Sequence, residues 1–415
     1  MNDEKSKDLI YDFQDRKYVM AFTGYKIVKS PGPRRLLNIA YVCGIYLLDG
    51  YLLAMAAISV YVSLGNVVGT IHCFHLFLLV FTILVGLTIK QINRRELEIL
   101  SQSLRNGLYT YEGEAVLQEH LKIREAGVKE IRKLSKGFTR FLCFSGTSNT
   151  VFISLMQLLI IDEDTSQRPL NPYLPQPIYM PFQTRTPIGF CIGFFINIVY
   201  MLYLCAIVIC MNEIYLSCMA QLRDQFKILN HSLQNIYERA VSVHSEVGKS
   251  REDLFENEKF QECLVFCLRN NVKHHQTLIK LIKTFNGYGG EAFLSVICLA
   301  SVILAAHVIL ILEKPGFHIM VNFIVTLTAE LFYTLHYCWY GQELLDESAQ
   351  VYFSLYKTPW IHANEKFKKM LKIMMINTRD PTMIKTPGFN ATASLETFGT
   401  IISTMYQIMS VVRNK

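Results

Sequence analysis

Two histidines near residue 70 are the side chains whose type and spacing come closest to a chemical site. His72 and His75 are three residues apart, so on a helix they share one face. A metal ion would need further His, Cys or carboxylate ligands at matching spacing, and none accompany the pair. We therefore predict no metal site. Two interpretations stay open: the pair forms a polar corner of a ligand pocket, or it packs against a neighbouring helix.

Two carboxylates also fall inside apolar stretches of the chain. Asp49 and Glu330 each lie near the middle of such a stretch. A charge at the centre of a bilayer costs about 2.5–3.5 kcal/mol on insertion scales, so both side chains should face protein or water rather than lipid. For Asp49 the alternatives are a hydrogen bond to a neighbouring helix and a direct role in an ion pathway.

A third polar feature is the run Ser-Gly-Thr-Ser-Asn-Thr at positions 145–150, in the middle of another apolar stretch. Small hydroxyl residues let membrane helices approach closely, and this packing role is one interpretation. Six small or polar residues in succession exceed what packing requires. The other interpretation is the wall of a partly polar cavity.

The signatures of enzymes are missing from the sequence. It contains no phosphate-binding loop, dinucleotide fingerprint, HExxH, nucleophile elbow or CxxC pair. Most of the eleven cysteines lie in apolar blocks, where we interpret them as small hydrophobic side chains. We therefore predict that the protein is not an enzyme and uses no cofactor.

The elements that must position these residues are membrane helices. The chain has 415 residues, of which 51% are hydrophobic and 18% charged, and the apolar residues occur in long blocks. A helix needs about 20 apolar residues to cross roughly 30 Å of hydrocarbon. The fold class predicted is all-α, a polytopic membrane protein with seven transmembrane helices. The predicted spans are residues 36–64, 68–89, 138–161, 188–211, 291–312, 317–340 and 391–412.

The distribution of basic residues sets the orientation of these spans. Lys and Arg number eight in residues 1–35, ten in 90–137, ten in 212–290 and seven in 341–390, whereas the alternate connections and the C-terminal tail hold only five. Because the basic side faces the cytosol, we predict a cytosolic N-terminus and an extracellular C-terminus. The net charge of +7 is then a topology signal, and no nucleic-acid partner is expected. Residues 1–35 lack an apolar core segment, so we expect no signal peptide.

The spans divide the chain into six predicted segments. A cytosolic segment 1–35 precedes spans one to four in 36–211, which include a proline-rich outer loop at 162–187. A helical cytosolic extension occupies 212–290, spans five and six occupy 291–340, and a cytosolic anchor segment occupies 341–390. The last span and tail occupy 391–415. The outer loop could be a lid or a simple linker, and the cytosolic helices could pack within one chain or join several chains.

The last span carries nine hydroxyl, amide or acidic side chains. A lipid-facing helix would not carry so many polar groups, so one face should meet water or other chains. We favour a helix that lines a pore. A fully buried central helix is the alternative.

The C-terminal fifth of the chain carries an ordered set of residues that resembles the signature of insect odorant receptors. The matching residues are Tyr340-Gly341, Ser348, Tyr356 and Trp360, Phe367-Lys368-Lys369, Pro381, Ser394-Leu395, Phe398 and Tyr406. The cytosolic N-terminus predicted from charge agrees with this family. The resemblance implies a ligand-selective subunit of a ligand-gated, non-selective cation channel. Rival interpretations are a gustatory receptor, which usually carries Gln-Phe in the last span, a G-protein-coupled receptor, and a transporter.

The resemblance also implies where the functional residues should lie. A small, volatile or semi-volatile apolar ligand would bind in the outer half of the membrane, among spans two, three, four and six. By depth we assign to this pocket His72, His75, Phe77, Ser148, Phe152, Phe194, Tyr200 and Phe323. The family further implies a pore near Ser403, Tyr406, Met409 and Arg413, and anchor or oligomer contacts at Tyr340, Gly341, Tyr356, Trp360 and Phe367. The implied partners are the odorant co-receptor, in a heterotetramer, and the bilayer of the plasma membrane, in a sensory dendrite.

Overall fold

The computed structural model describes residues 33–105, 109–152, 170–171, 173–244, 251–312 and 317–413. Within these ranges the regular elements are helices, apart from one isolated antiparallel bridge between Lys385 and Thr392. The prediction of an all-α fold is confirmed. The predictions for residues 1–32, for the end of span three beyond 152 and for the first part of the outer loop lie outside the described residues. The helices are α3 (Pro33–Val62), α4 (Val67–Ile92), α5 (Arg94–Arg105), α6 (Glu114–Thr147), the π-helical turn η3 (Ser148–Phe152), α8 (Pro187–Gln234), α9 (Ile236–His244), α10 (Arg251–Glu256), α11 (Glu258–Leu312), α12 (Phe317–Tyr356), the 3-10 turn η5 (Trp360–His362), α13 (Glu365–Thr378) and α14 (Leu395–Arg413).

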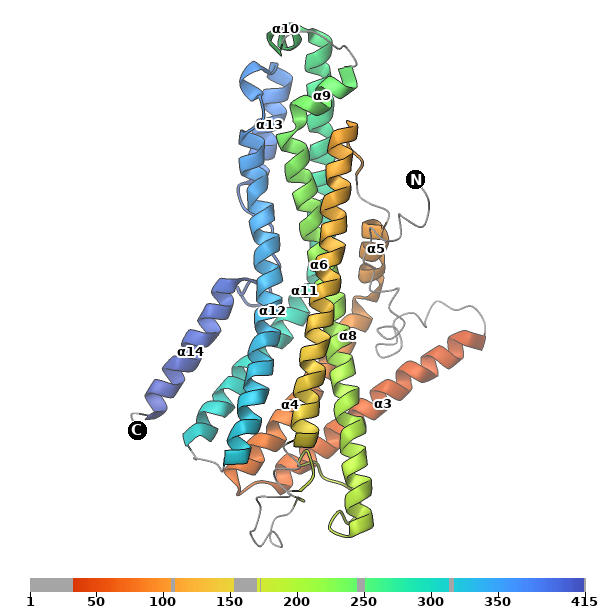
Figure 1. Cartoon of the computed structure of the whole chain (residues 1–415), viewed down its shortest axis with the longest axis vertical. Helices are drawn as coiled ribbons and strands as arrows, with labels where there is room; N and C mark the ends of the chain where they lie inside the picture. Colours follow the sequence, from red (N-terminus) through yellow and green to blue (C-terminus); the bar gives the residue numbers. More distant parts are fainter. Residues whose placement is uncertain are drawn as a thin grey trace.

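Long helices carry the chain from the membrane into the adjoining bundle without a break. Among the described residues, four helical stretches are long and apolar enough to cross a bilayer: Ile39–Val62, Val67–Ile92, Pro187–Gln234 and Glu258–His307. The three other predicted spans fall in α6 with η3, in α12 and in α14. Helices α8, α11 and α12 continue through positions 211, 290 and 340, so the segment boundaries predicted there are not breaks in the structure (Figure 1).

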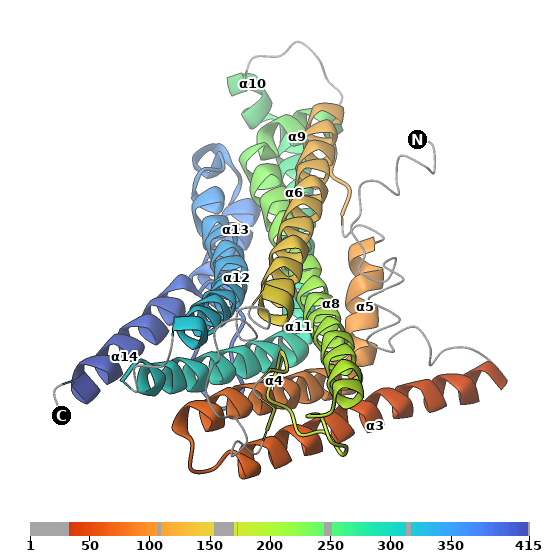
Figure 2. The same cartoon turned by 60° about the horizontal axis from the view of Figure 1, so that its bottom comes forward.

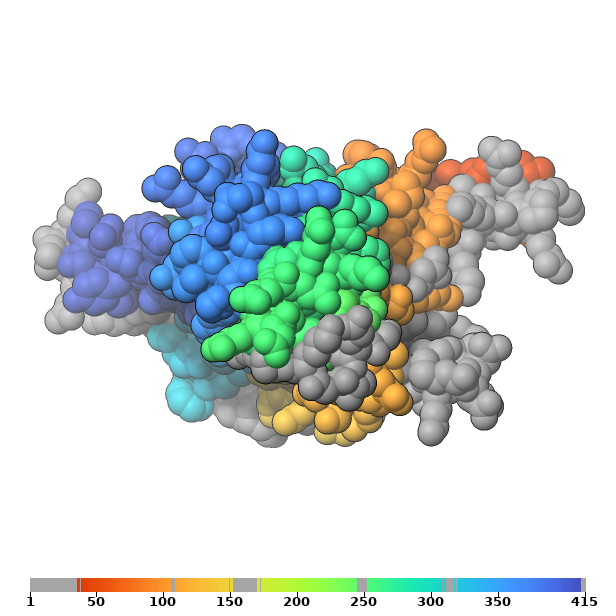
Figure 3. All heavy atoms as spheres, turned by 90° about the horizontal axis from the view of Figure 1, so that it is seen from above, coloured from red at the N-terminus to blue at the C-terminus, as the bar shows by residue number. Residues whose placement is uncertain are grey.

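The end of the molecule away from the spans is a dense helical bundle, which we call the anchor bundle. It comprises residues 114–137 of α6, 211–234 of α8, 258–290 of α11, 337–356 of α12, and α9, α10 and α13 (Figure 1). The apolar stripe predicted for the extension of span four lies in its core. Leu222, Phe226, Leu229, Leu233 and Ile236 are all fully buried. Viewed from this end, segments from widely separated parts of the sequence close against one another (Figure 3).

The opposite end, which we call the membrane half, is more open. It comprises residues 33–92, 138–152, 187–210, 291–312, 317–336 and 395–413. Helices α3 and α14 stand at opposite edges, and α14 leaves the bundle at an angle (Figures 1 and 2). Large apolar side chains such as Leu36, Tyr61 and Ile188 are more than two-thirds exposed. Such a surface suits lipid or a partner protein, not water.

A hairpin of residues 384–393 connects the anchor bundle to α14, and two glycines let it approach the long helices. A Cβ on Gly290 of α11 would lie 2.2 Å from the Lys385 carbonyl oxygen, and a Cβ on Gly341 of α12 would lie 2.1 Å from the Ala393 carbonyl oxygen. Only glycine allows such contact of backbone with backbone. The Lys385 amide donates to Asn286 Oδ1 at 2.9 Å, so the hairpin is also hydrogen-bonded to α11.

Several residues of the C-terminal signature hold this connection in place. Ser348 Oγ accepts a hydrogen bond from the Thr382 amide at 2.8 Å. Ser394 Oγ accepts one from the Thr397 amide at 3.3 Å and thereby caps the first turn of α14. Gln342 Oε1 accepts one from the Leu395 amide at 3.3 Å. Ser348 and Ser394 of the signature, together with Gln342, thus hold the segment between α12 and α14 in place.

Candidate functional site

A cavity of about 160 Å³ lies between five helices, in the membrane half and the adjoining end of the anchor bundle. Its walls come from α4, α6, α8, α11 and α12, and one residue of the outer loop, Gln176, also lines it. On α4 the lining extends from His72 to Gly86, which are about 21 Å apart along a helix axis. The cavity therefore begins at the outer end of the spans and extends inward toward the anchor bundle.

The outer end of the cavity is lined by imidazole rings. His72 Nε2 lies 3.1 Å from Gln176 Oε1, which joins α4 to the outer loop. His75 Nε2 is buried and has no hydrogen-bond partner among the described residues. Its ring lies 6.2 Å from that of His307 on α11, and the ring of Phe323 on α12 lies 5.6 Å from that of His72. The two histidines thus face the interior and leave a polar atom available to a ligand.

The outer loop packs into the top of the spans. The Tyr179 amide donates to Ser59 Oγ on α3 at 2.7 Å, and the Gln176 amide donates to Asn197 Oδ1 on α8 at 3.2 Å. Leu174 and Ile178 are buried. The described part of the loop therefore covers the outer end of the bundle, and Gln176 reaches the cavity.

One face of α12 supplies the longest continuous wall. The lining residues follow helical spacing from the outer to the inner end: Asn322, Phe323, Thr326, Ala329, Glu330, Tyr333 and Tyr337. Glu330 stands near the middle of this row and is half-buried. No side chain among the described residues forms a hydrogen bond or ion pair with its carboxyl group. At the inner end the hydroxyl groups of Tyr333 and Tyr337 lie 3.1 Å apart.

Helix α11 forms a wall that the sequence analysis did not assign. It contributes Tyr288, Ala292, Ser295, Val296 and Leu299, all from one helical face. The signal that could have revealed this face is the spacing of its small residues, Ala292 and Ser295, within an apolar span.

The structure places some of the eight residues predicted to bind ligand at the cavity and others away from it. His72, His75 and Phe323 line the cavity. Tyr200 is not among the lining residues, although it is buried in the same apolar cluster as Leu76 and Leu204, which do line the cavity. Phe77 stacks between Phe74 and Phe81, and Phe194 packs on Phe190. Ser148 is half-buried in η3 outside the lining, whereas Ser145 and Gly146 of the same polar run line the cavity. The Phe152 side chain lies outside the described part. The binding assignment stays a prediction for all eight.

A family model described as 7tm Odorant receptor matches residues 51–406. The chain belongs to the odorant receptor family. Odorant receptor 85f of Drosophila melanogaster is 28% identical to this receptor over 139 residues, which are 32% of this chain and 34% of that protein. Putative odorant receptor 92a of the same species is 27% identical over 94 residues, or 23% of each protein. The receptor is thus aligned to about a third or less of the length of these relatives.

The fold of the receptor is shared with a solved structure over nearly its whole length. The insect olfactory receptor OR5 from Machilis hrabei has a TM-score of 0.74 at 12% identity, covering 96% of this receptor and 97% of that chain. The structure of OR5 in complex with eugenol has a TM-score of 0.72, covering 97% of both chains. The family expected from the C-terminal signature is confirmed, and with it the polytopic membrane fold.

The predicted pore residues lie on α14, at the edge of the receptor. Tyr406 is 67% exposed, Ser403 is exposed and Met409 is half-buried. The Arg413 side chain lies outside the described part. Polar side chains such as Ser403 and Thr404 lie on a helix that also exposes Val411. The helix is therefore not a buried central one within the single chain, and its role in a pore stays a prediction.

The predicted anchor residues divide into buried and exposed positions. Tyr340, Gly341 and Phe367 are buried in the receptor, so they stabilise one chain. Tyr356 is 63% exposed and lies beside Trp360 along a groove on α12 and α13, with 6.5 Å between their ring centroids. Contact between chains is thus open to Tyr356 and Trp360, and it stays a prediction.

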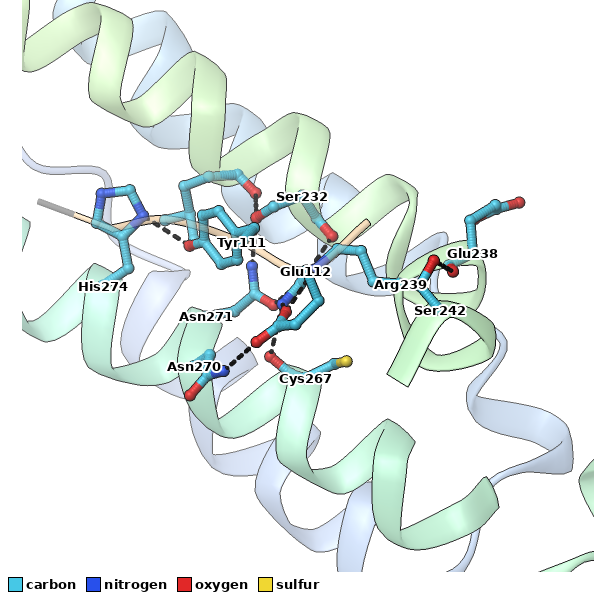
Figure 4. A network of polar contacts seen from close by, with 11 residues as sticks. Tyr111, Glu112, Ser232, Glu238, Arg239, Ser242, Cys267, Asn270, Asn271 and His274 are labelled. Atoms are coloured by element: carbon cyan, nitrogen blue, oxygen red, sulfur yellow. Dashed lines mark hydrogen bonds and ion pairs between the residues drawn. The ribbon is translucent and has the colours of Figure 1, made fainter. Parts of the chain in front are cut away.

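A buried arginine holds the segment before α6 against the anchor bundle (Figure 4). Arg239 of α9 donates to Glu112 Oε2 at 2.7 Å, to Asn271 Oδ1 at 2.7 Å and to the Ser232 carbonyl oxygen at 3.0 Å. Its guanidinium carbon lies 4.3 Å from the centroid of the Tyr111 ring. A buried charge is tolerated only when it is paired and hydrogen-bonded in this way.

Neutral histidines pack around this network. The Tyr111 hydroxyl lies 2.7 Å from His274 Nδ1, and His231 Nδ1 lies 3.1 Å from His120 Nε2. Burial lowers the pKa of His120 and that of His274 to about 3 each. Both rings are therefore uncharged at neutral pH.

Proposed function

We propose that this receptor is the ligand-selective subunit of an odorant-gated cation channel. Membership of the odorant receptor family and the cavity between the five helices support this assignment. The cavity has the character of a small-molecule site, with mostly apolar walls and a few convergent polar groups. The solved complex of OR5 with eugenol supports a small aromatic or similarly apolar ligand class.

Helix α14 is the proposed pore helix. It exposes polar and apolar side chains together, which suits a position where one face meets water and another meets a neighbouring subunit. Channel opening requires that ligand binding favour the open state over the closed one. The hairpin of residues 384–393 connects α14 with α11 and α12, both of which line the cavity.

The partner in this proposal is the odorant co-receptor, in a heterotetramer at the plasma membrane of a sensory neuron. The exposed groove at Tyr356 and Trp360 and the exposed face of α14 are the surfaces that would contact other subunits.

Patch-clamp recording in cells that lack other insect proteins tests the proposal. Rapid non-selective cation currents are expected when odorants are applied to cells that express both the receptor and the co-receptor. The same odorants should give no current in cells that express the co-receptor alone. Responses that require second messengers, without direct currents, would contradict the channel.

The pore assignment is tested by a pair of cysteine variants. Ser403→Cys on α14 should make the current sensitive to a charged, water-soluble thiol reagent, because the side chain would border an aqueous path. Ser301→Cys on α11 is the matched control, since Ser301 is also exposed on a helix of the membrane half but not on α14. Equal sensitivity of both variants, or of neither, would exclude Ser403 from the pore.

A further inference from the structure

The cavity has an uneven distribution of charge. Among the described residues that line it, Glu330 alone carries a carboxyl group and none is Lys or Arg. Asp49, another carboxylate of the membrane half, does not line the cavity and accepts a hydrogen bond from the Tyr203 hydroxyl at 2.8 Å. Glu330 thus differs from Asp49 because its carboxyl group is left without a partner.

The geometry of α12 directs Glu330 toward the cavity. Tyr333 and Tyr337 are three and seven residues further along, positions that share the face of Glu330 on a helix. All three line the cavity, together with Tyr288 from α11. Glu330 lies about 10 Å along the helix axis from Phe323 at the outer end and about the same distance from Tyr337 at the inner end.

An unpartnered carboxyl group in an apolar cavity is costly, and a ligand that supplies a donor removes this cost. A protonated amine fits best, because it provides both opposite charge and hydrogen bonds. Tyrosine rings are attracted to cations through their π-faces, and three of them share the cavity with the carboxyl group. A carboxylic acid would place two carboxyl groups together without a basic residue between them.

We infer that Glu330 is a specificity-determining residue that selects small amines with an apolar body over alcohols and acids of the same length. The ammonium group binds at Glu330 beside Tyr333, and the apolar body lies against the aliphatic lining of α4 and α8, such as Leu79 and Leu204. This inference rests on the proposed function, because the same cavity serves as the odorant site.

Three six-carbon ligands that differ in their head group allow the effect of that group to be compared: 1-hexylamine, 1-hexanol and hexanoic acid. In cells with the receptor and co-receptor, hexylamine should be the most potent of the three. Glu330→Gln keeps the size of the side chain but removes its charge, and it should weaken the response to hexylamine about tenfold or more, the size of effect that one charged hydrogen bond provides. The response to hexanol should change much less.

Asp49→Asn is the matched control, because it removes a membrane carboxyl group outside the cavity and should leave the order of potency unchanged. Equal potency of hexylamine and hexanol on the wild type, or equal loss of both in Glu330→Gln, would overturn the inference while the channel function stands. If none of the three ligands opens a channel, ligand binding to the purified receptor tests the inference. Hexylamine should then raise its thermal unfolding temperature in the wild type and not in Glu330→Gln, and the absence of this difference would overturn the inference.

Discussion

The anchor bundle and the membrane half share the same long helices, yet their polar and apolar side chains have different surroundings. In the anchor bundle, large polar groups such as Arg223 and Arg239 are almost fully buried and paired within the chain. In the membrane half, Tyr61, Ile188 and Phe195 are exposed. His75 Nε2 is buried without a hydrogen-bond partner among the described residues, and the half-buried Glu330 lines the same cavity.

The difference indicates which half depends on other molecules. The buried arginines of the anchor bundle find their partners within the chain, so their charges do not depend on another molecule. The membrane half presents apolar surface and open polar groups that lipid, neighbouring subunits and a ligand must complete. Substitutions in the anchor bundle should therefore change stability first, and substitutions at the cavity or on α14 should change the response first.

The largest loss of stability is expected from Arg239→Leu. Removing one partner of a buried ion pair destabilises a protein by about 3–5 kcal/mol, because the other charge is left unpaired. Here Glu112 and Asn271 would lose their shared donor. Thermal unfolding of the purified receptor, followed by loss of the monodisperse peak in size exclusion, measures the effect.

Lys368→Leu provides the comparison for Arg239. Lys368 pairs with Glu365 at 3.1 Å, but their side chains are 38% and 90% exposed. Exposed pairs contribute about 0–1 kcal/mol, so this variant should unfold close to the wild type. If both variants behave alike, the anchor bundle is not held by its buried charges.

A smaller loss, about 1–3 kcal/mol as for other overpacked sites, is expected from Gly341→Ala. The added Cβ would meet the Ala393 carbonyl oxygen at 2.1 Å, so the hairpin before α14 has to move. We expect reduced odorant currents as well as reduced stability, measured by patch clamp and thermal unfolding. Gly44→Ala on α3 is the control, since a Cβ there meets no atom within 4 Å. Normal currents from Gly341→Ala would show that the close contact is dispensable.

A further effect is expected in the pH dependence of stability. In the unfolded chain an imidazole titrates near 6.5, whereas burial holds the pKa of His120 and of His274 at about 3 in the fold. Below pH 6.5 the unfolded state therefore binds protons that the folded state does not, and stability falls as the pH decreases toward 3. The thermal unfolding temperature should decrease between pH 7.5 and 5.5.

The variant His274→Asn should make that decrease shallower, because the amide does not titrate. His362→Asn, which replaces an exposed histidine outside this network, is the matched control. A slope that is identical in the wild type and in His274→Asn would show that the buried ring does not contribute.

Periodicity and charge predicted much of the fold from local properties of the sequence. The stripe from Leu222 to Ile236 repeats at helical spacing, so its burial follows from one helix alone. The wall formed by α11 could not be predicted in this way, since Ser295 lines the cavity only because α11 packs against α4 and α12. Depth in the membrane predicts Tyr200 and Phe194 for the pocket, but depth does not determine which side of a helix faces the cavity. The exposure of α14 likewise depends on how the hairpin directs it.

The two glycine contacts of that hairpin have a mechanical consequence. Its carbonyl oxygens touch α11 at Gly290 and α12 at Gly341, with no side chain in between to absorb a displacement. The hairpin can keep both contacts only while these helices hold their spacing. A molecule that increases the distance between α11 and α12 would therefore displace the hairpin. The first turn of α14, which follows the hairpin directly, would move with it.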